Sequence, residues 1–161
     1  PTGCRRMTSP PRERELVQGT CVALEGIGLL LRGRPGIGKS DLALRLIDEG
    51  AALVADDVVQ VFKRDGRLLA RLPDEAPPET RGRLEVRGLG IIPVRNVPET
   101  ALHFVVELKP QAEIERLPEP EHWILLDVQL PVISVDPRTA SATAKLRLVA
   151  RGGPGVIMPP P

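Results

Sequence analysis

The stretch Gly33-Arg34-Pro35-Gly36-Ile37-Gly38-Lys39-Ser40 decides how this sequence is to be interpreted, because it satisfies the pattern G-x-x-x-x-G-K-[ST] in full. A short apolar run, Leu29–Leu31, precedes it, and such a run is typical of a strand buried on both faces of a sheet. Ser40–Glu49 follows and is predicted to be a helix that ends at Gly50. The apolar face of this helix comprises Leu42, Ala43, Leu46 and Ile47. A strand, a glycine-rich loop and a helix in this order predict a phosphate-binding loop.

Each residue type in the loop has a chemical reason to be there. Glycines let the backbone curl so that successive N–H groups converge on phosphate oxygens. The positive end of the following helix dipole points at the same anion. Lys39 is expected to reach the β and γ phosphates, and the Ser40 hydroxyl is expected to bind Mg²⁺, which prefers oxygen ligands. We therefore predict that all eight residues, 33–40, contact a nucleotide.

A second motif is the apolar strand Leu53–Ala55, which runs directly into Asp56 and Asp57. Ligands of open α/β sheets bind at the carboxyl ends of strands, so these two acids are expected to face the phosphate loop. One carboxylate there can orient Mg²⁺, and the other can accept a proton from an attacking hydroxyl. An acidic turn after a strand is the alternative interpretation.

A third segment, residues 83–92 with the sequence RLEVRGLGII, holds two glycines, two cations and one acid. It is expected to be flexible and able to bring Arg87 to a phosphate and Glu85 to a metal ion. A solvated turn that leads into a strand fits its composition equally well.

The rest of the chain alternates between strand and helix patterns, which predicts one α/β domain over residues 16–151. The expected strands are Thr20–Leu24, Val58–Phe62, Leu102–Leu108, Trp123–Val128 and Val132–Val135, with a hairpin turn at Asp65-Gly66. Residues 139–151 are predicted to be a helix, although their alternation also permits a strand. Residues 73–82 and 109–121 are expected to be connections without regular structure, and residues 1–15 and 152–161 disordered tails.

Composition excludes several classes of function. No apolar run approaches the length of a membrane span, and the first 15 residues lack the apolar segment of a secretory signal. A net charge of +1 and only three aromatic residues disfavour a protein that works by binding nucleic acid. Cys4 and Cys21 form no metal-binding pattern and are expected to be reduced thiols of a cytoplasmic protein.

Taken together, GRPGIGKSDLAL, LVADDVV and LEVRGLGIIPVRN resemble the C-terminal catalytic domain of bacterial HPr kinase/phosphorylase, in the order and near the spacing of that family. The resemblance covers roughly residues 16–150 and is to the short, single-domain form. It implies an α/β fold that contains a P-loop, with a mixed sheet similar to that of PEP carboxykinase and flanking helices. It also implies an ATP- and Mg²⁺-dependent kinase that phosphorylates a serine of the carrier protein HPr in the regulation of carbohydrate metabolism, a reaction that many members of the family also reverse by phosphorolysis. Longer members are hexamers, which implies a homo-oligomer.

The resemblance also implies roles for individual residues. Lys39 would be a catalytic cation and Ser40 a magnesium ligand. Asp57 is assigned as the base that takes the serine proton, although Asp56 could share or hold that role. Glu85 would be the second magnesium ligand, and the loop Leu84–Pro93, which includes Arg87, would close over the substrate serine.

The sequence departs from the family pattern at two places. The family has a histidine where this chain has Gln18, and an amide cannot titrate near neutral pH, so phosphorolysis is the less secure half of the expectation. The catalytic arginine after the last strand of the family aligns with Ser141, and Arg138 lies close enough to substitute for it. Two alternatives stay open from the sequence: a P-loop kinase of a small metabolite, and a nucleotide-binding regulator without catalysis.

Overall fold

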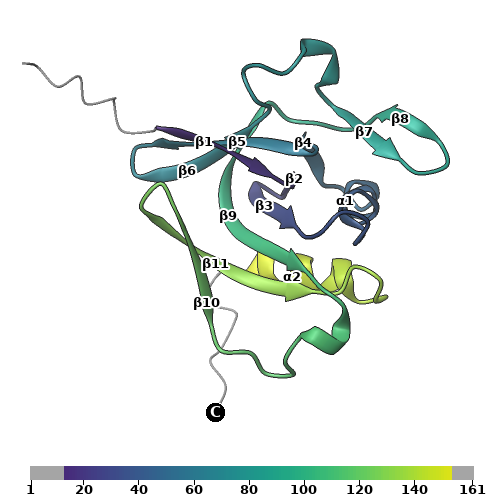
Figure 1. Ribbon diagram of the computed structural model, residues 1–161, viewed down its shortest axis with the longest axis vertical. Helices are drawn as coiled ribbons and strands as arrows, with labels where there is room; N and C mark the ends of the chain where they lie inside the picture. Colours follow the sequence, from purple (N-terminus) through teal and green to yellow (C-terminus); the bar gives the residue numbers. More distant parts are fainter. Residues whose placement is uncertain (1–12, 154–161) are drawn as a thin grey trace, which may run out of the picture.

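The computed structural model describes residues 13–153, which form a curled, nine-stranded mixed sheet, a separate two-stranded hairpin and two helices (Figure 1). The strands are β1 (Arg14–Gln18), β2 (Thr20–Leu24), β3 (Ile27–Arg32), β4 (Ala52–Ala55), β5 (Val58–Arg64), β6 (Arg67–Arg71), β7 (Arg83–Val86), β8 (Gly90–Pro93), β9 (Glu99–Leu108), β10 (Glu121–Leu125) and β11 (Val128–Val135). The helices are α1 (Lys39–Asp48) and α2 (Ala142–Gly152), and two short 3-10 turns occupy Pro78–Thr80 and Gln111–Glu113.

The long strand β9 organises the sheet, because it pairs with three neighbours along its length. Its first residues pair with β6 in antiparallel fashion, and its later residues pair in parallel with β3 and with β11. On the side of β3 the order continues through β2 to β4, and on the side of β6 it continues through β5 to β1. The hairpin partner β10 extends from β11.

One edge of the sheet collects the carboxyl ends of four strands. β3, β9 and β11 run in parallel, and β4 runs in the same direction because both β3 and β4 are antiparallel to β2. The loops that leave this edge are residues 33–38, 56–57, 109–120 and 136–141. Segments far apart in the sequence therefore meet at this edge.

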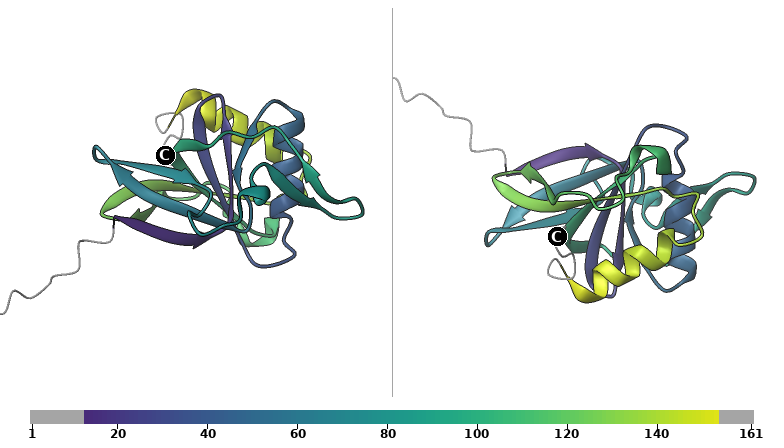
Figure 2. Two further views of the ribbon diagram at one scale, coloured as in Figure 1. Left: turned by 90° about the horizontal axis from the view of Figure 1, so that it is seen from above. Right: turned by 90° about the horizontal axis from the view of Figure 1, so that it is seen from below.

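The two faces of the sheet are covered differently. Both helices pack with β2, β3, β4, β9 and the buried Leu84 of β7 in one apolar cluster. The second cluster contains residues of β1, β5, β6, β10 and β11 and no helical residue, because the sheet curls over its own face there. Figure 2 shows α1 and α2 on the same side of the molecule, away from β1, β5 and β6.

Most of the predicted elements are confirmed. The helix predicted over residues 40–49 is α1, and the strands predicted at 20–24, 29–31, 53–55, 58–62 and 102–108 are β2, β3, β4, β5 and β9. The hairpin turn at Asp65-Gly66 joins β5 to β6, where Arg64 pairs with Arg67. Residues 142–152 are a helix and not a strand.

One predicted element is wrong in part. The strand predicted over residues 123–128 is interrupted by a turn, because Leu126 and Asp127 adopt positive φ values of 48° and 65° and reverse the chain between β10 and β11. For the segment 83–92, where a flexible segment and a turn leading into a strand were both open, the structure shows β7 and β8 paired as a hairpin, which is nearer to the second interpretation. Leu84 of that hairpin is buried against the cluster that holds α1.

Regular structure extends slightly into both segments that the sequence analysis expected to be disordered tails. β1 begins at Arg14 and pairs with β5, and α2 continues to Gly152. The predictions for residues 1–12 and 154–161, which include Cys4, lie outside the described residues. The loop predicted over residues 73–82 is present, with one 3-10 turn inside it.

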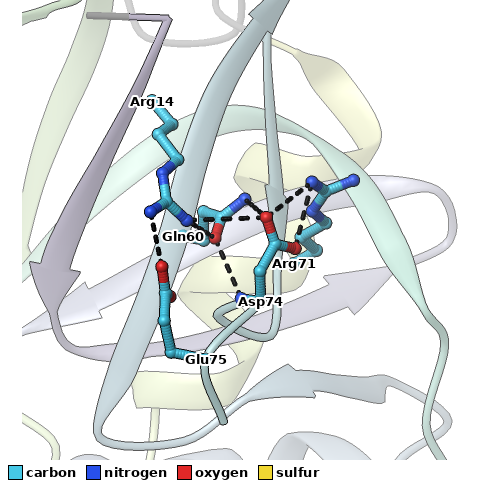
Figure 3. A network of polar contacts seen from close by, with 5 residues as sticks. All are labelled: Arg14, Gln60, Arg71, Asp74 and Glu75. Carbon is cyan, nitrogen blue, oxygen red and sulfur yellow. Dashed lines mark hydrogen bonds and ion pairs between the residues drawn. The ribbon is translucent and has the colours of Figure 1, made fainter.

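A polar network fastens this loop to the sheet (Figure 3). Gln60, which is only 1% exposed on β5, accepts hydrogen bonds from Arg14 and from the backbone N–H of Asp74, each at 3.0 Å, and donates to the Asp74 carboxylate at 3.2 Å. Arg71 pairs with the same carboxylate at 3.1 Å, and Arg14 pairs with Glu75. The network satisfies the buried amide of Gln60 and joins β1, β5, β6 and the loop.

Candidate active site

The predicted phosphate loop leaves β3 after Arg32 and enters α1 at Lys39, as the motif requires. Gly36 and Gly38 adopt φ values of 82° and 116°, in the left-handed region that favours glycine. Gly33 has no space for a side chain, because a Cβ there would lie 2.8 Å from Cγ2 of Ile37 and 3.1 Å from the carbonyl oxygen of Leu108. The glycines therefore allow both the curl of the loop and its close approach to the end of β9.

The loop presents unsatisfied donors. Within the described residues, the backbone N–H groups of Gly36 and Gly38 have no hydrogen-bond partner, and no side chain caps α1 at Gly38. The first N–H groups of a helix have no partner inside the helix, so they are available to an anion at this end. The Lys39 ammonium donates to the carbonyl oxygens of Gly33 at 2.6 Å and Arg34 at 3.1 Å, which holds it over the loop. These donors fit the phosphates of a nucleotide.

The two aspartates come to the same edge of the sheet as the loop. Ala55 of β4 pairs with Cys21 of β2, which pairs with Leu30 of β3 on its other side. Asp56 therefore lies level with the end of β3 and two strands away, about 10 Å at the usual strand spacing. The sequence-based expectation that the acids and the loop share one edge is confirmed by this register.

The structure gives the two aspartates different environments. The Asp56 carboxylate accepts a hydrogen bond of 2.9 Å from the hydroxyl of Thr20, a residue that is only 1% exposed. Asp57 is exposed, and its side chain has no hydrogen-bond or ion-pair partner among the described residues. Asp56 is thus held in place, whereas the Asp57 side chain is exposed and free of such contacts within residues 13–153.

The backbone at Asp57 is strained. Its φ is 71°, and the Val58 N–H donates to the Asp56 carbonyl at 2.9 Å, which makes Asp57 the central residue of a three-residue turn. The Asp57 carbonyl accepts the N–H of Gly19 at 3.0 Å, which ties the turn to the β1–β2 connection. Backbone strain of this kind is concentrated at functional sites. The sequence analysis did not predict it, although aspartate is among the residues enriched at positive φ.

Gln18 lies beside this turn, because it pairs with Val58 at the start of β5. Its side chain is exposed, like that of Asp57. The residue that departs from the family pattern is therefore located next to the aspartate pair.

The loop after β11 closes the other side of the phosphate loop. A Cβ on Gly38 would lie 3.4 Å from Cγ of Pro137, and the guanidinium of Arg45 on α1 donates to the Pro137 carbonyl. Arg138, the next residue, is exposed. Ser141 begins α2 as its N-terminal cap position. Arg138 thus lies three residues after the end of β11 and directly follows Pro137, which packs on the phosphate loop.

Asp136 in this loop escaped the sequence analysis. Its carboxylate accepts the backbone N–H groups of Arg138 at 2.9 Å and of Gln111 at 2.8 Å, and the residue is 8% exposed. The N–H of Arg138, and secondarily that of Gln111, lowers the pKa of Asp136 below its usual value. The only sequence signal was an acid directly after a predicted strand.

Glu85 and Arg87 lie on the other structural unit, the β7–β8 hairpin. Because side chains alternate along a strand, Leu84 and Val86 face α1 and Glu85 faces outward with Arg83. Among the described residues, neither Glu85 nor Arg87 forms a hydrogen bond or an ion pair with the phosphate loop or the aspartates. Their assignment to metal and phosphate binding stays a prediction.

Oxygen ligands for Mg²⁺ are present at the shared edge, namely the Ser40 hydroxyl and the two aspartates. Residues 13–153 contain no cluster of three or more His, Cys, Asp or Glu side chains that could hold a metal ion.

Comparison with known proteins identifies the family. The family model described as "HPr Serine kinase C-terminal domain" matches residues 12–150. The chain belongs to this family. It is 36% identical over 138 residues to HPr kinase/phosphorylase of Lactiplantibacillus plantarum and 43% identical over 107 residues to that of Clostridium beijerinckii. These matches cover 79% and 66% of this chain but only 43% and 32% of the relatives, so the chain spans less than half their length.

A solved structure of the same family supports the fold. The Hpr(Ser) kinase/phosphatase from Coxiella burnetii superposes with a TM-score of 0.74 at 25% identity, over 86% of this chain and 90% of that one. The expected mixed α/β fold is therefore confirmed. Among the helices in residues 13–153, none is long and apolar enough to cross a membrane.

Proposed function

We propose that this chain is an ATP- and Mg²⁺-dependent protein-serine kinase whose substrate is an HPr-like phosphocarrier protein. The observation that carries the proposal is the pairing of two features at one edge of the sheet. A loop of unpaired backbone N–H groups with Lys39 over it lies there, and so does the exposed, strained Asp57. Relatives named HPr kinase/phosphorylase support the choice of substrate.

The residues of this chain divide the reaction between them. The unpaired N–H groups of Gly36 and Gly38, those of the first residues of α1 and the Lys39 ammonium bind the phosphates and stabilise the charge that develops on the β–γ bridging oxygen. Asp57 accepts the proton of the attacking serine hydroxyl as that oxygen bonds to the γ phosphorus and the bond to ADP breaks. Mg²⁺, held by Ser40 and an aspartate, would supply neutralisation of phosphate charge. The hydrogen bond from the Thr20 hydroxyl holds the Asp56 carboxylate, which supports Asp56 as the aspartate that binds the metal ion.

The exposure of Asp57 supports a protein as the phosphoryl acceptor, because a serine carried on a protein loop can reach an exposed carboxylate. Two shallow hollows elsewhere on the described surface are formed by residues 118–122 and 131–134 and by residues 66–68, 101–103 and 128.

Reversal by phosphorolysis is the weaker part of the proposal. Gln18 stands beside Asp57, where the family pattern has a histidine, so no imidazole shares the proton there. We assign to Arg138 the role of the cation that the family pattern supplies later in the loop. We place the kinase in the cytoplasm and expect it to form a homo-oligomer, which light scattering of the purified chain would test.

The test is transfer of labelled γ-phosphate from MgATP to purified HPr. Lys39→Ala and Asp57→Asn are expected to abolish transfer, and Lys63→Ala is the matched control because Lys63 is an exposed lysine on β5. Full activity of the Lys39 variant would contradict the proposal. MgATP binding without transfer to HPr would instead favour a regulator without catalysis, an alternative that Gln18 supports, and transfer only to a small metabolite would favour a metabolite kinase.

A further inference from the structure

The phosphate loop rests on two supports from neighbouring strands. Its first glycine, Gly33, packs against Leu108 at the end of β9, and its last glycine, Gly38, packs against Pro137 after β11. At Gly33 a Cβ would lie 3.1 Å from the Leu108 carbonyl oxygen, which leaves no space for a side chain, and at Gly38 a Cβ would lie in ordinary van der Waals contact, 3.4 Å from the Pro137 ring. The shape of the loop therefore depends on where the two supports lie.

Asp136 joins these supports to each other. One carboxylate oxygen accepts the N–H of Gln111, three residues after the end of β9, and the other accepts the N–H of Arg138, which follows Pro137. The backbone oxygen of Asp136 accepts both the N–H of Thr139 at 3.2 Å and its hydroxyl at 2.9 Å. An ionised carboxylate that accepts two backbone N–H groups makes a strong and directional link.

A third contact extends the link to the helix that carries the catalytic lysine. Arg45 lies on α1, six residues after Lys39, and its guanidinium donates to the Pro137 carbonyl. The same guanidinium pairs with Asp41 at 3.2 Å. The loop after β11 thus contacts the phosphate loop at Gly38 and α1 at Arg45, and Asp136 sets the position of that loop.

We propose that Asp136 is a positioning residue for nucleotide binding, which acts by holding Pro137 against Gly38. This inference rests on the proposed function, because it assumes that the phosphate loop binds MgATP. Asp136 is buried, and both of its carboxylate oxygens accept backbone N–H groups, of Gln111 and of Arg138, so it acts through the position of Pro137. A donor array for phosphate is effective only when its N–H groups are held in place before binding, so release of this support weakens binding without removing any donor.

The test compares Asp136→Asn with Asp74→Asn by calorimetric titration of MgATP into the full chain, at a temperature where both variants are folded. The two substitutions are matched, because each neutralises a carboxylate that ties a loop to the sheet through hydrogen bonds. Asp74 belongs to the network of Figure 3 and contacts no residue of the phosphate loop. We expect the Kd for MgATP to rise roughly 10- to 100-fold in Asp136→Asn and to stay unchanged in Asp74→Asn.

An unchanged Kd in Asp136→Asn overturns the inference, and so does an equal rise in both variants, since that would reflect general loosening of the fold. If Asp136→Asn does not fold, Pro137→Ala decides the matter: it removes the ring that packs on Gly38, and an unchanged Kd in that variant overturns the inference as well. No binding by the wild type overturns the proposed function and this inference together, whereas binding by the wild type with an unchanged Kd in Asp136→Asn overturns this inference alone.

Discussion

Asp57 combines a strained backbone with a proposed chemical role, and substitution separates the two. A residue with a Cβ in the left-handed conformation costs about 1–2 kcal/mol relative to one in the ordinary conformation, and glycine avoids that cost. Glycine in turn loses about 0.5–1 kcal/mol through the greater freedom of the unfolded chain. With φ at 71°, we expect Asp57→Gly to be more stable than Asp57→Ala by about 1 kcal/mol.

The assay is thermal unfolding of both variants beside transfer of γ-phosphate to HPr. For a chain of this size, 1 kcal/mol corresponds to a difference in Tm of about 2–4 °C. Both variants lack the carboxylate, so transfer is expected to fall by about 10²- to 10⁴-fold in each, whichever is the more stable. Asp57→Asn, which tolerates positive φ, is expected to match the wild type in Tm and to be as inactive as the other two.

Two outcomes would refute this reasoning. If Asp57→Ala were as stable as Asp57→Gly, the turn would not be strained in solution. If activity followed Tm across the three variants, the loss of transfer would come from the fold and not from the missing carboxylate. A useful control is Asp56→Gly, which removes the acceptor of the Thr20 hydroxyl and is expected to lower Tm.

Three further predictions concern other parts of the molecule. Gln60→Leu is expected to lower the free energy of unfolding, measured by urea titration, by about 2 kcal/mol, because it removes the hydrogen bonds of a fully buried amide. An unchanged midpoint of the urea titration would contradict the network in Figure 3. Burial raises the pKa of the Cys21 thiol to about 12, so Cys21 is expected to resist a disulfide reagent at pH 8 until urea unfolds the chain; rapid reaction in the native state would show that β2 opens. Two backbone hydrogen bonds lower the pKa of Asp136, so its ionised form stabilises the fold at pH values above the ordinary aspartate pKa. That contribution is lost as the pH falls through the lowered pKa, and the difference in unfolding free energy between wild type and Asp136→Asn is therefore expected to close in acid. A difference that widens in acid would contradict the lowered pKa.

The sequence was sufficient to predict those elements whose local pattern agrees with their packing in the folded chain. The phosphate loop and α1 follow from glycines, an apolar strand and a helical face within about twenty residues, and these are short-range properties. Asp56 and Asp57 could be assigned to the same edge because strands that run in parallel expose their carboxyl ends together. The strand β1 was missed because an edge strand tolerates charged residues such as Arg14 and Glu15, which erase the apolar alternation.

The hairpin turn between β10 and β11 was missed for a related reason. Leu126 and Asp127 take positive φ without a glycine, so no turn signal is visible in the sequence, and the cross-strand pairing of Leu125 with Val128 supplies the stability. The β7–β8 hairpin became visible only in the structure, where Leu84 is buried against the cluster that holds α1.

The sequence by itself predicted the chemistry of the chain: which residues would bind phosphate, which acids would move a proton, and which family they resemble. Only the tertiary structure decided which aspartate is held and which is free, because Thr20 lies 36 residues away from Asp56. It likewise decided the support of the phosphate loop by Asp136, which depends on loops after two different strands. Local propensity acts between neighbours in the chain, whereas hydrogen bonds and packing act between whatever groups the sheet brings together, and that pairing cannot be read from one strand at a time.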